Sequence, residues 1–256
     1  MTVRFASLGS GSKGNGTVID DGDTCLLIDL GFTLKDAVRR LARLNLDPKS
    51  IDAILVTHEH ADHCHGVPAF ARKFKTPVYL THGTYQPDSM GQLPSLNCIN
   101  CHEPFRLGTF EVAPVAVPHD AKEPCQYVTS SKGLRVGVLT DLGHITPHVR
   151  DCYRECDALL LECNHDVQML HDGPYPWPLK QRVGGEYGHL NNEQAGDLLG
   201  SVNLQRLRKL VISHVSEQNN QRGLALAALQ GQLGSWSGEL IVATQSEGLA
   251  WTEIGG

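Results

Sequence analysis

The sequence has no long apolar run. None of its stretches reaches the about 18 consecutive apolar residues that a membrane-spanning helix requires. The N-terminus also lacks a positively charged segment followed by an apolar one, which is the pattern of a secretory signal. We therefore expect a protein that does not bind a membrane and carries no export signal.

A disulfide framework is missing as well. The 8 cysteines are scattered along 256 residues, and in a chain of this length such spacing is typical of a protein in a reducing compartment. Cys98 and Cys101 are spaced like half of a zinc ribbon, but no second Cys-x-x-Cys accompanies them. We therefore expect a cytoplasmic location and no zinc ribbon.

An excess of positive charge is absent. The formal net charge is −6, with 22 basic against 28 acidic residues. Proteins that hold nucleic acid by bulk electrostatics are usually basic, so any such binding must use a local patch. Histidine, by contrast, is abundant, with 13 in the chain. It is the commonest metal ligand among side chains and the one most easily tuned for proton transfer near neutral pH.

Internal repeats and low-complexity linkers are also missing, and we expect residues 1–256 to form one domain. Residue patterns predict helices at 34–44, 66–75, 192–201 and 221–233, and strands at 3–8, 17–20, 24–29, 52–57, 77–81, 109–118, 134–140, 157–162, 209–213, 239–244 and 248–254. Strand meanders followed by alternating helices and strands predict an α/β fold with mixed sheets and helices outside. The segment 165–188, rich in proline and glycine, is expected to be a long functional loop.

The stretch L-G-S-G-S-K-G-N-G matches the dinucleotide fingerprint G-x-G-x-x-G at Gly9, Gly11 and Gly14. Asp29 follows where a dinucleotide-binding fold has its ribose-binding acid. That fold needs a helix directly after the glycines. Here Gly16 and a β-branched run precede an Asp-Gly turn, which predicts a strand instead. We expect no dinucleotide, and the loop is either a tight turn or a set of backbone N–H groups facing an anionic ligand.

A dense group of ligand-type side chains follows the apolar strand D-A-I-L-V-T. The segment T-H-E-H-A-D-H contains His58, His60, Asp62 and His63. Because alternate residues of an extended segment point the same way, His58 and His60 can converge on one ion. Asp62 and His63 lie past the bend and can face a second ion. Imidazoles with a carboxylate suit zinc, manganese or iron.

Three further candidates lie at the ends of apolar runs. His119 follows V-A-V-P, Asp141 follows G-V-L-T, and His214 follows L-V-I-S. Each alone is as often an ordinary polar loop residue as a ligand. Together with the dense group, they complete two coordination spheres along one edge of the sheets.

With these residues in place, the sequence resembles the metallo-β-lactamase-fold metallohydrolases. H-x-H-x-D-H is the most specific motif of that superfamily, and the candidates above follow the order of its five motifs. The stretches LGSGSKGNG, PHDAKEP, LLECNHD, YPWPLKQRVGGEYGHLNN and SHVSEQNN resemble the YycJ/WalJ branch, nuclease-like proteins related to ribonuclease Z. That branch usually has serine where this chain has Lys13 and Asn191.

The resemblance implies an αββα sandwich of two mixed sheets with helices on the outer faces. It also implies two divalent metal ions, zinc or manganese with iron possible, that would activate a bridging water for hydrolysis. The first ion would take His58, His60 and His119, the second Asp62, His63 and His214, with Asp141 bridging the two. Asp29 would lie behind a ligand and fix its tautomer by a hydrogen bond.

The same resemblance implies an enzyme that hydrolyses ester bonds, most closely a phosphodiesterase or nuclease of the DNA exonuclease type. A histidine placed like His189 acts on the scissile phosphate in ribonuclease Z-like enzymes, and Asp62 is the other residue assigned to catalysis. Lys180 and Arg182 could hold phosphate oxygens, and His165 could line the pocket. The alternatives are a polar helix start for His189 and a solvated pair for Lys180 and Arg182.

Other functions of the same fold compete with this one. A glyoxalase II-like thioesterase or another small-molecule hydrolase shares the ligands. Glyoxalases, however, add a helical C-terminal extension, whereas the residues after His214 predict one helix and two strands. A flavodiiron oxidoreductase would have glutamate at position 60. A non-catalytic binder of metal and nucleic acid or protein usually lacks a ligand, and here none is missing.

Overall fold

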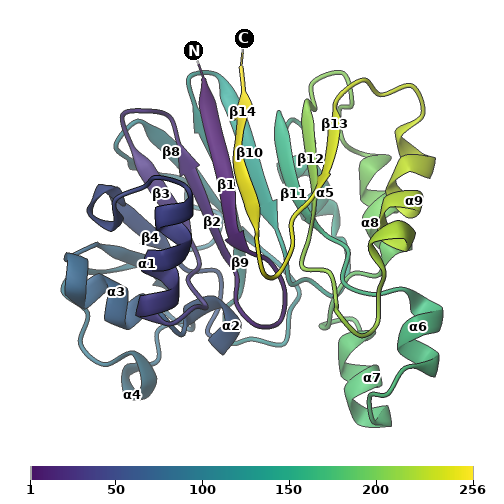
Figure 1. The fold of residues 1–256 in the computed structure, drawn as a ribbon, viewed down its shortest axis with the longest axis horizontal. Coiled ribbons are helices and arrows are strands. Elements are labelled where there is room, and N and C mark those ends of the chain that lie inside the picture. Colours follow the sequence, from purple (N-terminus) through teal and green to yellow (C-terminus); the bar gives the residue numbers. More distant parts are fainter. Residues whose placement is uncertain (1, 256) are drawn as a thin grey trace.

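Two seven-stranded β-sheets pack face to face, with helices on the outer face of each (Figure 1). The structure is a computed structural model and describes residues 2–255. The predicted sandwich of two mixed sheets between helices is therefore confirmed. That residues 1–256 form one domain stays a prediction.

The first sheet has the strand order β14-β1-β2-β3-β4-β5-β6. Its strands, in that order, are Leu249–Ile254, Val3–Gly9, Gly16–Asp20, Cys25–Ile28, Ala53–Leu55, Val78–Thr81 and Leu96–Ile99. Pairing is antiparallel from β14 to β3 and parallel from β3 to β6. The first and last strands of the chain therefore lie side by side, as Figure 1 shows.

The second sheet has the order β13-β12-β11-β10-β9-β8-β7. Its strands, in that order, are Glu239–Val242, Lys209–Ser213, Ala158–Glu162, Leu134–Leu139, Cys125–Ser131, Phe110–Ala116 and Phe105–Leu107. Strands β10 to β13 are parallel, and β7 to β10 are antiparallel. The carboxyl ends of β10, β11 and β12 therefore meet at one edge of this sheet.

Helices cover the outer faces, and shorter helices lie in the loops. The covering helices are α1 (Leu34–Arg43) and α3 (Val67–Phe74) on the first sheet, and α5 (Pro147–Tyr153), α8 (Asn192–Leu199) and α9 (Arg222–Leu233) on the second. The shorter ones are α2 (Ala61–Cys64), α4 (Pro87–Met90), α6 (Val167–Asp172) and α7 (Trp177–Val183), with a 3₁₀ turn at Pro48–Ser50. No helix within residues 2–255 combines the length and apolarity needed to cross a membrane.

The continuous apolar runs of the central strands follow from this layering. In β11, Ala158 and Leu160 face the core between the sheets, whereas Leu159 and Leu161 pack under the helices. Because side chains alternate along a strand, a sheet covered on both faces must be apolar at every position. The predicted strands at 157–162 and 209–213 are confirmed on this ground.

The segment 165–188 differs from the sequence prediction. It was expected to be a loop, but it contains helices α6 and α7. The Asp166 side chain accepts from the Met169 backbone and starts α6, and Pro178 lies in the first turn of α7. Both helices are too short to show an apolar period, and proline is well tolerated in a first helical turn, so the proline-rich composition concealed them.

Candidate metal centre and active site

Strand ends bring the predicted ligands together. His58 follows β4, His119 follows β8, Asp141 follows β10 and His214 follows β12. The carboxyl ends of these strands meet at one edge of the sandwich, near α2 in Figure 1 and away from the two termini. All seven residues predicted as ligands belong to groups whose donor atoms lie within 4.8 Å of one another.

The two predicted coordination spheres correspond to two of these groups. One contains His58, His60 and His119, and the other contains Asp62, His63 and His214. Asp141 forms a third group with His58 and His63, so it adjoins both spheres. Its Oδ2 atom lies 2.8 Å from Nε2 of His63. This arrangement is suitable for a pair of ions that share one carboxylate.

An unusual backbone conformation recurs at the strand ends. Asp29, Asp141 and His214 have φ values of 60°, 54° and 51°. A non-glycine residue rarely adopts this left-handed conformation, although Asp, Asn and His tolerate it best. Such outliers often mark functional sites. Here each one directly precedes or begins the loop that aims its side chain into the cluster.

Hydrogen bonds decide which ring nitrogen carries the proton in four of the histidines. Nδ1 of His63 donates to Asp29 Oδ2 at 2.8 Å, Nδ1 of His119 donates to the Gly188 carbonyl at 3.0 Å, and Nδ1 of His214 donates to Glu162 at 2.9 Å. The Thr57 hydroxyl gives its hydrogen to Asp29, so its oxygen accepts from Nδ1 of His58 at 2.9 Å. In this tautomer a neutral ring presents the unprotonated Nε2 that a metal requires.

Unpaired buried atoms support a metal at this place. Nε2 of His58 and Nε2 of His214 are buried and have no hydrogen-bond partner, and the buried Oδ2 of Asp141 faces only Nε2 of His63, at 2.8 Å. A buried polar atom without a partner costs roughly 1–3 kcal/mol. Two imidazole nitrogens and a carboxylate oxygen in one cluster are the donor set that a divalent cation takes. The residues present therefore fit a divalent metal site.

Glu162, at the end of β11, was not among the predicted site residues. Its carboxylate is fully buried and accepts from Nδ1 of His189 at 2.8 Å and Nδ1 of His214 at 2.9 Å. Backbone N–H groups of Leu142 and Leu190 also donate to it. Burial alone would raise the pKa of Glu162, but the charge of His189 and the hydrogen bonds from the His189 and His214 side chains lower it to about 2. The signal that marked Asp141, an acid at the end of an apolar strand, also marks Glu162.

His189 faces the cleft from a rigid support. Burial would lower the pKa of its imidazole, but the Glu162 carboxylate outweighs burial, so the pKa lies above its ordinary value. Its Nδ1 is occupied by Glu162, and its side chain is 21% exposed. The ring can therefore carry a proton at neutral pH and present the other nitrogen to a bound group.

A cleft of about 330 Å³ opens over the metal-ligand cluster. Arg182 lies in its wall and forms an ion pair with Asp120, which adjoins His60 and His119. The other predicted phosphate residues lie elsewhere. Lys180 and His165 line a separate depression, and the Lys180 ammonium donates to the His171 carbonyl at 2.5 Å. Of the three, only Arg182 shares the cleft with His189.

The glycine-rich loop positions Asn15 against two of the predicted ligands. Strand β2 follows the glycines directly, as predicted, so no helix is present to receive a pyrophosphate. Gly11 has a φ of 145°, which favours glycine, and its N–H donates to Oδ1 of Asn15 at 2.8 Å. That bond fixes the amide, whose Nδ2 then lies 3.3 Å from Oδ2 of Asp62 and 3.0 Å from Nε2 of His63. The absence of dinucleotide binding stays a prediction.

The two departures from the branch pattern have local explanations. Lys13 forms an ion pair with Glu217 at 2.5 Å, which links the glycine-rich loop to the loop after β12. Asn191 caps α8, because its side chain accepts from the backbone of Gln194 while the Gln194 side chain accepts from its N–H. Neither residue contacts the predicted ligands.

We expect Asn15→Ala to weaken metal binding while leaving the fold intact. The amide orients the Asp62 carboxylate, and losing such an outer partner typically costs about 10–100-fold in metal affinity. Competition with a chromogenic chelator measures this affinity. Asn100→Ala is the matched control, because Asn100 is exposed and its side chain bonds only Glu103. Equal affinities in the two variants would contradict the assignment.

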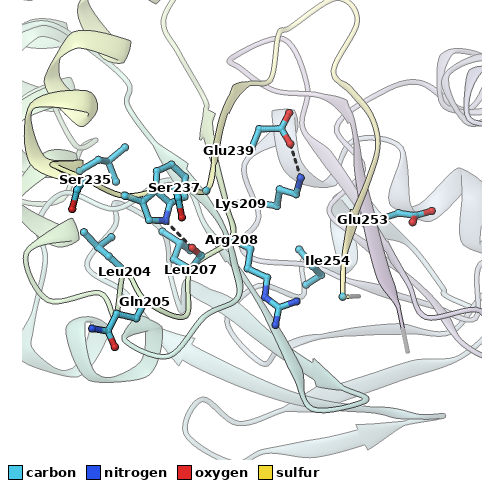
Figure 2. A pocket seen from close by; sticks show the side chains of 14 residues that line it. Leu204, Gln205, Leu207, Arg208, Lys209, Ser235, Ser237, Glu239, Glu253 and Ile254 are labelled. Atoms are coloured by element: carbon cyan, nitrogen blue, oxygen red, sulfur yellow. Dashed lines mark hydrogen bonds and ion pairs between the residues drawn. The ribbon is translucent and has the colours of Figure 1, made fainter.

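A larger hollow of about 710 Å³ lies at the opposite end of the second sheet (Figure 2). Its walls include the first residues of β12 and β13, where Lys209 and Glu239 form an ion pair. None of the ligand groups found within residues 2–255 borders it. Size alone therefore does not mark the functional site, which we place at the smaller cleft.

Comparison with known proteins agrees with this geometry. The model of the beta-lactamase superfamily domain matches residues 24–215, a span that includes every predicted ligand. The chain belongs to this superfamily. It is a metal-dependent hydrolase of the metallo-β-lactamase fold, and its clusters of histidine and aspartate side chains support divalent metal binding.

Two relatives place the chain within the superfamily. It is 33% identical to the exodeoxyribonuclease WalJ of Streptococcus pneumoniae over 236 residues, covering 90% of this chain and 88% of the relative. It is 32% identical to the exodeoxyribonuclease YycJ of Bacillus anthracis, covering 88% and 87%. The chain is therefore a member of the WalJ/YycJ family. Among solved structures, the metallo-β-lactamase-fold protein YhfI of Bacillus subtilis superposes with a TM-score of 0.75 over 99% of this chain at 15% identity, which shows the shared fold.

Proposed function

We propose that this WalJ/YycJ family member is a dinuclear metal-dependent phosphodiesterase that removes nucleotides from DNA. The observation that carries the proposal is the pairing of His189 with Glu162 beside a metal-ligand cluster. Hydrolysis of a thioester or a reactive ester has a good leaving group and needs no such acid. Cleavage of a phosphodiester expels an alkoxide, which does. The names of the two relatives, both exodeoxyribonucleases, support DNA as substrate.

His58, His60 and His119 would hold one ion, Asp62, His63 and His214 the other, and Asp141 would contact both. When bound, a pair of zinc, manganese or iron ions would supply an activated water and would stabilise charge on the attacked phosphate. Asp29 fixes the tautomer of His63, and Glu162 fixes that of His214, through the hydrogen bonds described above. These two acids lie behind the ligands, so their role is to orient imidazoles.

The residues of the cleft wall would handle the substrate. His189, held by Glu162, would give its proton to the leaving oxygen, and general-acid catalysis of this kind typically contributes about 10²–10⁴-fold. Asp62, one of the residues that would hold the second ion, would also orient the attacking water. The Arg182 guanidinium, already in the cleft, would bind a phosphate oxygen if the substrate displaces Asp120 from it.

A specific feature disfavours the thioesterase alternative. The residues after His214 form α9, β13 and β14, and the two strands complete the second and first sheets. Within residues 2–255 these elements belong to the sandwich, and α9 does not line the cleft. A non-catalytic binder is disfavoured because all seven predicted ligands gather at one place.

We expect protein purified without chelator to contain two transition-metal equivalents per chain. The reason is the two separate groups of three donor atoms with Asp141 adjoining both. Elemental analysis by mass spectrometry gives the stoichiometry and the identity of the metal. A fully active preparation that saturates at one equivalent would contradict the dinuclear site.

The substrate is tested directly with metal-loaded protein. Labelled single- and double-stranded DNA and RNA with defined ends are incubated beside a glutathione thioester. We expect mononucleotide release from DNA ends and negligible thioester hydrolysis. Cleavage of the thioester alone would support the alternative, and binding of nucleic acid without cleavage would support the non-catalytic one. A cytoplasmic location, proposed from the 8 scattered cysteines, is tested by fractionation of the source cells.

A further inference from the structure

The depression lined by His165 and Lys180 adjoins the cleft and has no role in the chemistry above. It measures about 240 Å³ and lies between α6 and α7. Its apolar lining comes from Val167, Leu170 and Trp177. We call it the α6–α7 pocket. Its size and its mixture of aromatic, aliphatic and polar groups resemble a site for a small planar group.

Exposed apolar side chains gather around this pocket. Trp177 is 64% exposed and Val167 is 50% exposed, and both line it. Tyr187, at 60%, lies in the same segment 165–188. Within residues 2–255, only Leu224 on α9, at 40%, is a large exposed hydrophobic residue outside this segment. Tryptophan left open to water beside a pocket is typical of a binding surface.

A buried polar atom in the wall of the pocket lacks a partner. His165 is 3% exposed and its Nδ1 is buried without a hydrogen bond. Burial lowers the pKa of this imidazole to about 4, so the ring is neutral near pH 7. A neutral imidazole can donate through one nitrogen and accept through the other. It therefore suits the edge of a heterocycle better than a phosphate or another anion.

Helix α7 lies between the pocket and the cleft and lines both. Leu179 and Arg182 line the cleft, and Trp177 and Lys180 line the pocket, so the helix divides the two cavities. Tyr175 lines the cleft and stands two residues before Trp177, a separation of about 7 Å along an extended chain. A strand that leaves the cleft past Tyr175 therefore reaches Trp177 within a short distance.

Charge along this path favours a nucleic acid. The Lys180 ammonium donates to the neutral His171 carbonyl, and no carboxylate within residues 2–255 forms an ion pair with it, although Asp172 lies close enough that this charge adds to the side-chain hydrogen bonds that lower its pKa. It stands on the helix that also carries Arg182. Single strands are bound by aromatic side chains that stack bases and by cations that track phosphates. The pocket offers both, although the chain as a whole carries a net charge of −6.

Resting on the proposed phosphodiesterase function, we propose that the α6–α7 pocket binds a base of the strand whose phosphodiester lies in the cleft. Trp177 stacks on the base, His165 contacts its polar edge, and Lys180 holds the neighbouring phosphate. In a duplex, bases are paired and stacked, so the pocket selects single strands. This assigns segment 165–188 as the strand-binding element of the enzyme.

The test measures binding separately from cleavage. Metal-loaded wild-type protein, Trp177→Ala and the control Leu224→Ala are titrated with fluorescent phosphorothioate oligonucleotides, which resist hydrolysis, as single-stranded DNA, single-stranded RNA and duplex DNA. We expect Trp177→Ala to raise the Kd for a single strand about 5- to 100-fold, the scale of one base–aromatic stack. Leu224→Ala should bind like wild type, and the DNA and RNA arms show which strand the pocket takes.

An abasic oligonucleotide tests whether Trp177 contacts a base. If Trp177 stacks on a base, removing the bases near the strand end should weaken wild-type binding and leave Trp177→Ala binding unchanged. Equal Kd values of wild type and Trp177→Ala for the intact strand would contradict the proposal that the pocket binds a base. Hydrolysis of bis-p-nitrophenyl phosphate should be the same in Leu224→Ala and the wild type, which shows that the control variant keeps an intact active site. If single-strand binding depends on Trp177 but the protein cleaves no phosphodiester, the proposed phosphodiesterase function is wrong, whereas the proposed base-binding role of the pocket is supported.

Discussion

The His189→Ala protein is expected to keep both metal ions and to lose about 10²-fold or more of its turnover on a DNA phosphodiester. The imidazole stands outside the groups assigned to the two ions and bonds Glu162, which orients it from beneath the cleft floor. Without it, the leaving alkoxide must depart unprotonated. The loss should be smaller on bis-p-nitrophenyl phosphate, because p-nitrophenolate leaves readily without a proton.

The measurement compares kcat on both substrates with the metal content of the same preparations. Cleavage of DNA at the wild-type rate would show that His189 is not the acid. Loss of metal together with activity would show instead that His189 is a ligand. In that case His214 is the assignment to re-examine, because His189 and His214 share Glu162 and both belong to the group around Asp141.

The Asp141→Asn protein is expected to lose metal and activity together. Asparagine keeps the shape of the side chain and tolerates the left-handed backbone, where φ is 54°, so the fold should survive. It removes the charge that adjoins both groups of ligands. The fall in metal affinity should exceed the about 10–100-fold that follows the loss of an outer partner, and turnover should drop to that of chelated wild-type protein.

Chelator competition, elemental analysis and circular dichroism together test this second result. Asp120→Asn is a suitable comparison, because Asp120 bonds Arg182 in the same cleft and is absent from the four ligand groups within residues 2–255. It should retain both ions. An Asp141→Asn protein that binds two ions with wild-type affinity would show that the bridge is made by another group.

The candidate ligands could be named from the sequence because local order controls their positions. The segment from His58 to His63 is only six residues long, so its side chains must lie near one another whatever the rest of the chain does. His119, Asp141 and His214 each follow an apolar run, and such runs become buried strands whose ends reach a sheet edge. The alternation and continuity of apolar residues also determined the central strands.

Tertiary structure alone decided which of these ends meet. Glu162 carries the same strand-end signal as Asp141, but only the parallel pairing of β11 with β12 places it against His214, and only the fold of segment 165–188 brings His189 onto its other side. Lys180 and Arg182 are two residues apart in sequence and cannot be told apart there. Helix α7 turns them about 200° from each other, at 100° per residue, so one faces the cleft and the other the α6–α7 pocket. Short-range pattern fixes what a side chain can do, whereas long-range pairing and helix phase determine what it stands beside.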